Sequence, residues 1–467
     1  MTRGRSNRAP LRILTGAVCG VWVLAYPAAG QEDPGDQRFS FGLSQKFGAN
    51  DNNRLNPVSV GTTYFSDTNL SFGFNSQTGI QRFDFTLGGV FRALDDPLSG
   101  RDSGFRDPNL NLSYVRDGVN SRLTLNASYK RPDLAFLDTL QQEEIDNQDL
   151  ATGDGRREDY QLGVRLETGL SAPLGFEFGL GTSGRRYNNT TDPTLFDNHT
   201  DTGTFGARLQ FSPVTQGRVD LSEDRYTGKD LLGTNRTTRR FTLGLVHEFS
   251  PIALLNANIG HSEVSETFDA LPGVENLTRG PVGSLTLTRE VPNGAIRASL
   301  DTTLSTVGRQ TTFELGRTFE LPLGALEIGF GASKGSGFSL LPIGKIDYTA
   351  ELATGSLSAS LSRAVSISST LSQAQTTTRL AFGYNFDINT VSSLSFNLDY
   401  ADISLTGGGG GPDSARGNFS ASYTRDLTKD WDVRFGYKRR YSNSTTTSSA
   451  ASNLVFLTLQ RDFEVFR

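Results

Sequence analysis

Cysteine, methionine, tryptophan and histidine are almost missing from this sequence. Its 467 residues include one Cys, one Met, two Trp and three His. One cysteine cannot form an internal disulfide, so a chain of this length must be stabilised in another way. With so few Cys and His residues there is no cluster at the spacing of a transition-metal site, and we expect neither a metal nor a cofactor.

Apolar residues are also scarce, at 36% of the chain, while glycine occurs 51 times. This composition is poor material for the two or three packed soluble domains that the length would allow. Beyond residue 30, no apolar run approaches the roughly 20 residues of a membrane-spanning helix.

The first 30 residues have the pattern of a cleavable signal peptide. Four arginines precede an apolar stretch from Ile13 to Tyr26, and small residues at 28–30 follow it. The alternative is an N-terminal membrane anchor, but the stretch is too short for a spanning helix. We predict a signal peptide at residues 1–30, cleaved before Gln31. Its removal takes away the four arginines and shifts the formal charge from −5 to −9, which does not suit a nucleic-acid-binding protein.

Strict alternation of apolar and polar residues recurs along the rest of the chain. In residues 379–389 one parity holds Leu380, Phe382, Tyr384, Phe386 and Ile388, and the other holds small, polar or charged residues. Similar runs of about ten residues, bounded by Gly, Asn, Asp, Ser or Pro, predict strands. We count about 22 strands, with a range of about 18 to 24, where a soluble β-sandwich has about seven to nine.

The connections between these runs alternate in length. Short turns are predicted at 168–173, 212–216, 250–251, 290–294, 320–324, 387–390 and 425–430. Longer polar connections are predicted at 94–109, 131–157, 187–201, 263–281, 403–415 and 441–452. Short periplasmic turns that alternate with longer extracellular loops are typical of transmembrane barrels.

Taken together, the patterns predict an all-β fold consisting of a single closed antiparallel transmembrane β-barrel. Residues 38–467 form the barrel, and residues 31–37 are a short periplasmic N-terminus. A closed barrel pairs every backbone N–H and C=O at membrane depth, which an open sheet does not. The apolar face then meets lipid, and the polar face meets water inside the barrel.

Charged residues on the polar parity are candidates for the lining of the lumen. They are Arg165, Glu167, Arg240, Glu248, Arg297, Asp301, Arg379, Asp387, Arg434 and Lys438. Because both signs are present, the list alone indicates no strong preference for one ion. Arg317 disobeys the pattern, since it shares parity with Phe313, Leu315 and Phe319. A lipid-facing Arg at mid-depth costs roughly 2–4 kcal/mol, so we expect a bulge there or a position near the membrane interface.

The chain resembles the Gram-negative outer-membrane β-barrel superfamily, in particular its porin-like members. The shared features are the cleavable signal, the repeated amphipathic runs and an aromatic-rich last strand, NLVFLTLQRDFEVFR. The resemblance implies a place in the outer membrane, contact with membrane lipid and lipopolysaccharide, and recognition of the last strand by the barrel-assembly machinery. Members usually end on an aromatic residue, whereas here Phe466 is penultimate. The stretch NDNNRLNPVSVGTTYFSD is similar to a little-characterised group of barrel porins linked to exported polysaccharide.

The resemblance implies a channel for hydrophilic solutes or an exported polymer. The alternative is a non-conducting barrel that displays its extracellular loops to partners. TonB-dependent receptors also have 22 strands, but they fill the lumen with an N-terminal plug. Only QEDPGDQ stands between Gln31 and the first expected strand near Arg38, so we do not expect active receptor uptake.

The longest predicted loop is a candidate constriction. Asp133 can cap a short helix with Leu134, Leu137, Leu140 and Ile145 on one face, and the segment can fold inward. An acidic cluster follows at Glu143, Glu144, Asp146 and Asp149. The alternative is an exposed loop whose charges are solvated or bridged by divalent cations.

Enzymatic activity is not expected. We place His199 in a loop, while His247 and His261 share parity with the apolar residues of their strands. Ser250 and Ser262 fall on the opposite parity, so no Ser–His pair is indicated.

Overall fold

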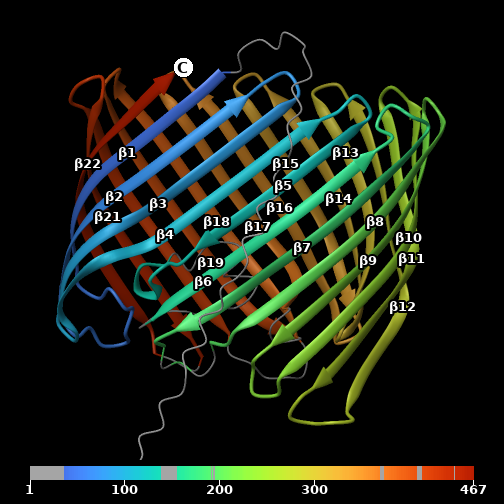
Figure 1. The fold of residues 1–467 in the computed structure, drawn as a ribbon, viewed down its shortest axis with the longest axis horizontal. Coiled ribbons are helices and arrows are strands. Elements are labelled where there is room, and N and C mark those ends of the chain that lie inside the picture. Colours follow the sequence, from blue (N-terminus) through green and yellow to red (C-terminus); the bar gives the residue numbers. More distant parts are fainter. Residues whose placement is uncertain are drawn as a thin grey trace, which may run out of the picture.

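The computed structural model describes residues 36–137, 155–190, 192, 195–368, 373–406, 413–445 and 448–466. In these residues 22 antiparallel strands form one sheet, drawn in Figure 1. The strands are β1 (Asp36–Asn50), β2 (Thr63–Gln77), β3 (Gln81–Asp96), β4 (Gly100–Asp117), β5 (Ser121–Lys130), β6 (Arg156–Thr168), β7 (Leu174–Asn188), β8 (Asn198–Ser212), β9 (Thr215–Gly228), β10 (Thr234–Ser250), β11 (Ala253–Phe268), β12 (Glu275–Val291), β13 (Gly294–Ser305), β14 (Gly308–Leu321), β15 (Gly324–Gly335), β16 (Phe338–Leu352), β17 (Gly355–Ser368), β18 (Gln373–Asn389), β19 (Ser392–Thr406), β20 (Ser414–Asp426), β21 (Trp431–Ser444) and β22 (Ala450–Phe466).

The sheet closes on itself because the first strand pairs with the last. β1 and β22 are antiparallel neighbours from Arg38 opposite Phe466 to Asn50 opposite Leu454. Every other strand pairs with the strands before and after it in the sequence. The predicted all-β closed barrel of about 22 strands is therefore confirmed. No helix among the described residues is long and apolar enough to cross a membrane.

The barrel has two different rims. β1 begins and β22 ends at the upper rim of Figure 1, which also carries short hairpin connections such as those after β8 and β10. We call it the turn rim. The opposite rim carries the longer connections, including the one after β5, and we call it the loop rim.

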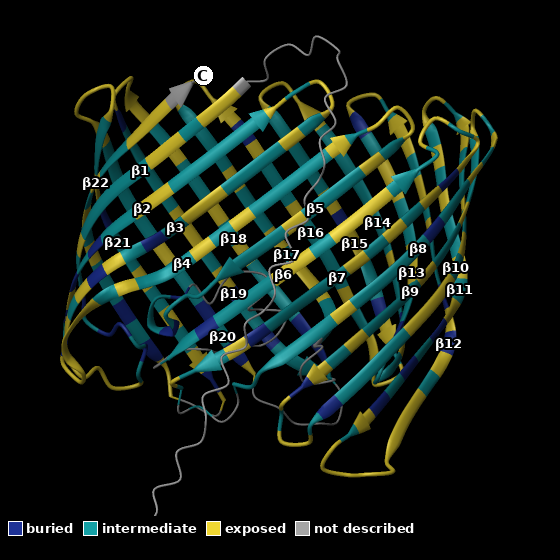
Figure 2. Ribbon diagram, viewed as in Figure 1, coloured by how far each residue is buried: buried dark blue, intermediate teal, exposed yellow. Residues whose placement is uncertain are grey.

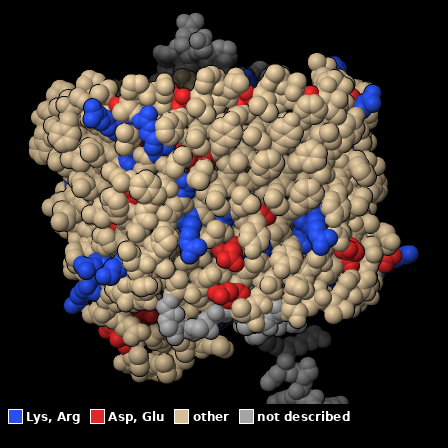
Figure 3. All heavy atoms as spheres, turned by 180° about the vertical axis from the view of Figure 1, so that it is seen from behind, with Lys and Arg blue, Asp and Glu red and all other residues tan. Residues whose placement is uncertain are grey.

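The outer wall is an apolar belt. Along β10, the exposed side chains of Phe241, Leu243, Leu245 and Phe249 share one parity, and most of the wall seen in Figure 3 carries no charge. Toward the loop rim the same parity changes to charged residues. There Glu223, Arg239, Glu263 and Arg279 lie directly opposite one another across β9 to β12.

This charged row marks the edge of the apolar belt. The Nε of Arg239 lies 2.7 Å from Glu223, and the Nε of Arg279 lies 2.5 Å from Glu263. Exposed ion pairs are compatible with lipid headgroups but not with hydrocarbon. From Phe241 to the turn rim β10 covers ten residues, which at the usual strand tilt is about 25 Å, the height of an outer-membrane apolar band.

Strands continue past this belt at the loop rim, so the connections there are shorter than the sequence predicts. The predicted loop at 94–109 reduces to three residues between β3 and β4, and the predicted loop at 263–281 reduces to six between β11 and β12. Ladder hydrogen bonds do not depend on side-chain polarity. Where both faces carry polar residues the amphipathic pattern stops, but the strand continues.

Arg317 needs no bulge. The registers of β14 with β13 and with β15 run without a shift through this residue. Its guanidinium donates to the carbonyl oxygen of Pro292 at 3.2 Å, in the neighbouring turn, and lies 4.8 Å from the ring centroid of Phe319. Of the two expected explanations, the bulge is absent, and the contact with the turn fits the other, a position near the membrane interface, which stays a prediction.

Burial is concentrated in the half of the barrel next to the loop rim. Among the buried residues other than glycine, all but Ala350 and Ser392 lie in the strand halves or connections of that side. Figure 2 shows most of the dark blue segments there. The packed part of the molecule is thus at one end of the barrel.

Candidate functional site: the lumen

All ten predicted lumen residues lie on the parity opposite to the exposed apolar side chains of their strands. Arg165 and Glu167, for example, alternate with the exposed Val164 and Leu166 on β6. Arg379 follows the same rule beside Leu380 on β18, as does Arg434 beside Phe435 on β21. The strand ladders bring several of them to inward-facing partners on neighbouring strands.

One ion-pair network runs along this face near the turn rim. Glu177 lies 3.2 Å from the Nε of Arg165 and 3.2 Å from an Nη of Arg218, which in turn lies 2.5 Å from Asp220. Elsewhere Arg379 pairs with Asp399 at 3.5 Å. Within the described residues no ion pair is recorded for Arg240, Glu248, Arg297, Asp301 or Asp387. Sequence reasoning did not select Arg218 and Asp220, although they follow the same parity rule.

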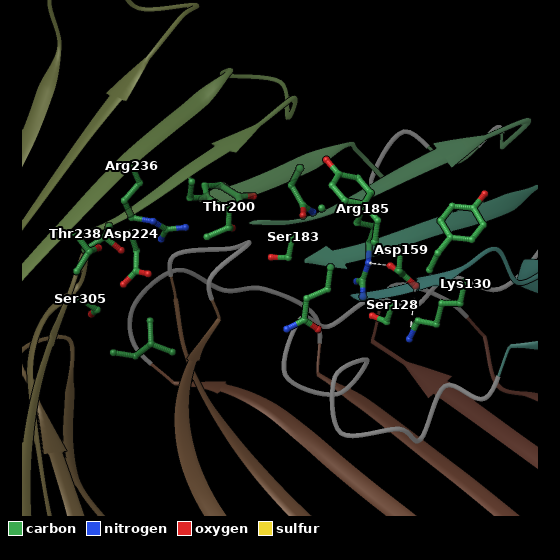
Figure 4. A pocket seen from close by; sticks show the side chains of 18 of the residues that line it. Ser128, Lys130, Asp159, Ser183, Arg185, Thr200, Asp224, Arg236, Thr238 and Ser305 are labelled. Carbon is green, nitrogen blue, oxygen red and sulfur yellow. Dashed lines mark hydrogen bonds and ion pairs between the residues drawn. The ribbon is translucent and has the colours of Figure 1, made fainter. Parts of the chain in front are cut away.

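A cavity of about 760 Å³ lies in the lumen toward the loop rim. Figure 4 shows side chains from several strands pointing into it. Amide and hydroxyl groups dominate its wall: Asn109, Asn111, Ser128, Gln161, Ser183, Asn198, Thr200, Thr238 and Ser305. Leu304 and Ile367 line the same cavity from β13 and β17. The cavity therefore spans the lumen between strands that are far apart around the barrel.

Three charged residues of the cavity, Lys130, Asp159 and Arg185, belong to one ion-pair cluster. The carboxylate of Asp159 lies 2.9 Å from the Nε of Arg157, 2.9 Å from the Nε of Arg185 and 3.6 Å from the Nζ of Lys130. Arg157 is fully buried. None of these residues was selected from the sequence. Small polar residues alternating with apolar ones on β5 to β10 were the available signal.

The start of the β5–β6 connection is anchored to the inner wall. Asp133 caps a short 3-10 helix, Leu134–Phe136, by accepting the backbone N–H of Ala135. Leu134 is 2% exposed and Leu137 is 7% exposed, and both pack against Tyr187 and Leu195. The predicted cap is thus present, and Leu134 and Leu137 share an apolar face on a helix of a single turn. The other two members of the predicted face, Leu140 and Ile145, lie outside the described residues. We call residues 131–137 the inner segment.

Arg92 on β3 is the main anchor of the inner segment. Its guanidinium lies 3.5 Å from the ring centroid of Phe136, and it pairs with Asp67 at 2.8 Å and with Asp107 at 3.0 Å. Phe136 also meets Phe65 edge to face, with centroids 5.4 Å apart. Because Arg92 is 4% exposed and paired on two sides, it forms a rigid platform for the ring.

Two further contacts attach the inner segment to the wall. An Nη of Arg440, on β21, donates to the carbonyl oxygen of Ala135 at 3.4 Å, and its other Nη donates to that of Asn53. The backbone N–H of Asp133 donates to Asp107 at 2.8 Å. Burial raises the pKa of the Asp133 carboxyl, and nearby Asp107 acts in the same direction, while Arg92 and the bond from Ala135 oppose the shift.

The four acidic constriction candidates, Glu143, Glu144, Asp146 and Asp149, lie outside the described residues, as do residues 1–35 with the predicted signal peptide. His199 is on β8 and not in a loop: its Nδ1 lies 3.0 Å from the hydroxyl of Tyr160 and its Nε2 lies 3.0 Å from Asp201. The Nδ1 of His247 lies 2.9 Å from the hydroxyl of Thr215. Among the described residues no group of three or more His, Cys, Asp or Glu residues could hold a metal ion.

No known family model matches the sequence, and no curated protein does. Solved structures do match. The ferric-catecholate import receptor Fiu from E. coli K12 has 9% identity and a TM-score of 0.57, covering 90% of this chain and 81% of its own. The siderophore receptor PiuA from Acinetobacter baumannii has 11% identity and a TM-score of 0.56, with coverages of 91% and 82%. The FrpB iron transporter from Neisseria meningitidis (F5-1 variant) has 10% identity and a TM-score of 0.55, with coverages of 93% and 83%.

At such low identity, the likeness shows the fold alone. This chain has the fold of outer-membrane β-barrel transport receptors, and the predicted place in the outer membrane of a Gram-negative bacterium agrees with it. The ferric catecholate, siderophore and iron in the names of those proteins are properties of those proteins.

Proposed function

We propose that this protein is an outer-membrane channel for hydrophilic solutes, constricted on the loop-rim side by its own inner segment. The observation that carries the proposal is the asymmetry of the lumen. Inward carboxylates at the turn rim, such as Glu248, Glu290 and Asp387, are exposed, while buried residues gather toward the loop rim. A barrel of 22 strands encloses far more space than side chains can fill, so an exposed inner wall favours a water-filled passage.

The inner segment supports the constriction. It contacts β2 and β3 through Phe65 and Arg92 and β21 through Arg440, although it leaves the wall between β5 and β6. A segment held on several strands narrows the passage in a defined place. We propose that the acidic residues 143–149 extend the same constriction.

The cavity supports a class of solute. Its wall is rich in Asn, Gln, Ser and Thr, and three of its charged residues, Lys130, Asp159 and Arg185, are already paired with one another. Amides and hydroxyls donate and accept hydrogen bonds, which suits polyhydroxylated solutes, including a carbohydrate chain, better than strongly charged ones. We also propose that lipopolysaccharide contacts the charged row formed by Glu223, Arg239, Glu263 and Arg279. The barrel-assembly machinery is proposed to recognise β22.

Single-channel recording in planar bilayers tests this function. Stable ohmic steps are expected, and deleting residues 133–150 is expected to raise the step size. An unchanged conductance in the deletion variant contradicts the constriction. A correctly folded, heat-modifiable barrel that stays silent contradicts the channel and favours a barrel that only displays its loops.

A further inference from the structure

The turn rim is built from a repeated unit that contains an exposed aliphatic residue and a carboxylate. In each unit the carbonyl oxygen of the last residue of a turn accepts a hydrogen bond from the backbone N–H of an acidic residue. The acidic residue lies at or near the end of the strand that pairs with the strand after that turn. Five units pair Ile80 with Asp117, Val214 with Glu248, Ile252 with Glu290, Leu323 with Glu351 and Val391 with Asp426, at 2.7–2.9 Å.

The aliphatic side chains of these units are open to solvent. Ile80 is 43% exposed, Val214 44%, Ile252 50%, Leu323 65% and Val391 44%. Turns normally use Gly, Asn, Asp or Ser for conformational reasons, and an aliphatic residue adds nothing to these. Its recurrence at the same place in five of the hairpins therefore points to contact with something else.

The acidic residues of these units face inward. Glu248, Glu290, Glu351 and Asp426 are exposed, and no ion pair is recorded for them within the described part of the chain. Two more units carry Glu320 and Asp387 with Asn293 and Thr354 in place of the aliphatic residue. From β10 to β21 every hairpin thus presents a carboxylate at the rim, an arc that runs along the top of Figure 1.

The spacing of the units selects the shape of a partner. Successive units are two strands apart, which is roughly 10 Å along the rim. That distance is close to two turns of an α-helix, or about seven residues, so a helix can present the same pair of side chains to each unit. An extended segment spans the same distance in about three residues. Because side chains of a strand alternate in direction, successive units would then meet opposite faces of that segment, so a helix fits the spacing better.

We propose that the arc of the turn rim from β10 to β21 is a docking surface for a basic amphipathic helix of a periplasmic protein. Lys or Arg at heptad intervals would meet the carboxylates, and aliphatic residues beside them would cover Ile252, Leu323 and Val391. Charge complementarity fixes the sign of the partner, and the exposed aliphatic residues distinguish it from a small cation. The proposal does not depend on whether the barrel conducts.

Fluorescence anisotropy tests the proposal without any measurement of current. The purified barrel is placed in phosphatidylcholine nanodiscs and titrated with a labelled peptide of about three heptads that carries one Lys and one Leu at fixed heptad positions. A peptide of the same composition in scrambled order is the control. The heptad peptide is expected to bind about tenfold more tightly than the scrambled one.

Three sets of substitutions locate the binding. Glu290→Gln, Glu320→Gln and Glu351→Gln together are expected to weaken binding about tenfold, as are Ile252→Ser, Leu323→Ser and Val391→Ser together. Asp84→Asn, Glu167→Gln and Asp462→Asn remove the same charge outside the arc, at residues that belong to no unit, and are expected to change it less than about twofold. Equal binding of both peptides overturns the proposal. An equal loss of affinity in both acidic sets also overturns it, because the attraction then comes from net charge alone. Unchanged affinity in the aliphatic set overturns it as well, because those side chains then contact lipid headgroups and not the peptide.

Discussion

At the scale of single residues, Phe136 is the contact that most directly holds the inner segment in the lumen. Its ring lies on Arg92 and meets the edge of Phe65, contacts worth roughly 2 kcal/mol together. We expect Phe136→Ala to increase the frequency of openings to a larger conductance, because the segment loses its hold while the wall stays intact. Single-channel recording measures this. Phe105→Ala, on the outward face, is the control and is expected to leave the openings unchanged.

Substitution of Arg92 has a different expected result. Asp67 is 5% exposed, so Arg92→Ala leaves a buried carboxylate without its charge partner, at a cost of about 3–5 kcal/mol. Openings that increase only in the Arg92 variant, and not in Phe136→Ala, would contradict the role of the aromatic contact.

Asp133 makes the inner segment sensitive to pH. Its carboxyl is buried next to Asp107, and the folded-state pKa is raised above the ordinary value of 3.8. The protonated form is then favoured when the segment is docked, so docking strengthens as pH falls through the folded pKa and weakens as pH rises through it. Larger openings should become rarer as pH falls through the raised pKa of Asp133. Asp133→Asn keeps an oxygen that accepts the backbone N–H of Ala135 and carries no charge. It is expected to show few large openings both below and above the pKa of the wild-type carboxyl.

Arg317 tests where the apolar belt ends on the turn-rim side. Its guanidinium reaches the carbonyl oxygen of Pro292 in the turn, so Arg317→Ala is expected to change the free energy of unfolding by less than about 1 kcal/mol. Leu315→Arg, two residues further from the turn on the same face, is expected to cost roughly 2–4 kcal/mol. Urea titration of the barrel in lipid vesicles compares them. A gain above about 2 kcal/mol for Arg317→Ala would place this arginine in hydrocarbon.

At the scale of strands, glycines make room for the inward aromatic residues at the seam of the barrel. Gly48 on β1 lies opposite both Phe65 on β2 and Phe456 on β22, and a Cβ at Gly48 would overlap the Phe65 ring. We expect Gly48→Ala to lower the free energy of unfolding by about 1–3 kcal/mol, with partial recovery when Phe65→Leu is added. Gly163→Ala, where a Cβ would meet nothing, is the control. Equal effects at both glycines, measured by urea titration, would contradict the overlap.

The strands also show what a sequence can predict. Parity is local, so the inward position of residues such as Arg165 and Asp387 follows from their neighbours. Strand ends at the loop rim are not local, because the ladder from β3 to β4 continues where the amphipathic pattern has stopped. The cap at Asp133 could be predicted because it lies within one turn of backbone. The Arg92 partner of Phe136 could not, since the two residues are far apart in the sequence and meet only through the registers of β3, β4 and β5.

At the scale of the whole molecule, barrel closure gathers charges that look balanced along the sequence into separate zones. Next to the inner segment Arg92 is paired with Asp67, and at the cavity Asp159 is paired with Arg157 and Arg185. At the turn rim, in contrast, Glu248, Glu290, Glu320, Glu351, Asp387 and Asp426 all face inward and are exposed. The ten candidates chosen from the sequence included only two of these, and their mixed signs hid the excess. The sheet order supplies the missing information, because it sets the ends of alternate strands side by side.

This arc of carboxylates predicts that the channel prefers cations over anions. A wall of one sign raises the local concentration of counter-ions, and the effect is screened over about 10 Å at 0.1 M salt. In a gradient of KCl across a planar bilayer, the reversal potential is expected to indicate K⁺ over Cl⁻ at low salt, with the preference lost near 1 M. Replacing the six carboxylates by amides is expected to bring the reversal potential close to zero. The pair Glu327→Gln with Lys345→Gln removes one charge of each sign from a 2.5 Å ion pair deeper in the lumen and should leave the preference unchanged. An equal shift in both variants would mean that the selectivity arises along the whole lumen and not at the turn rim.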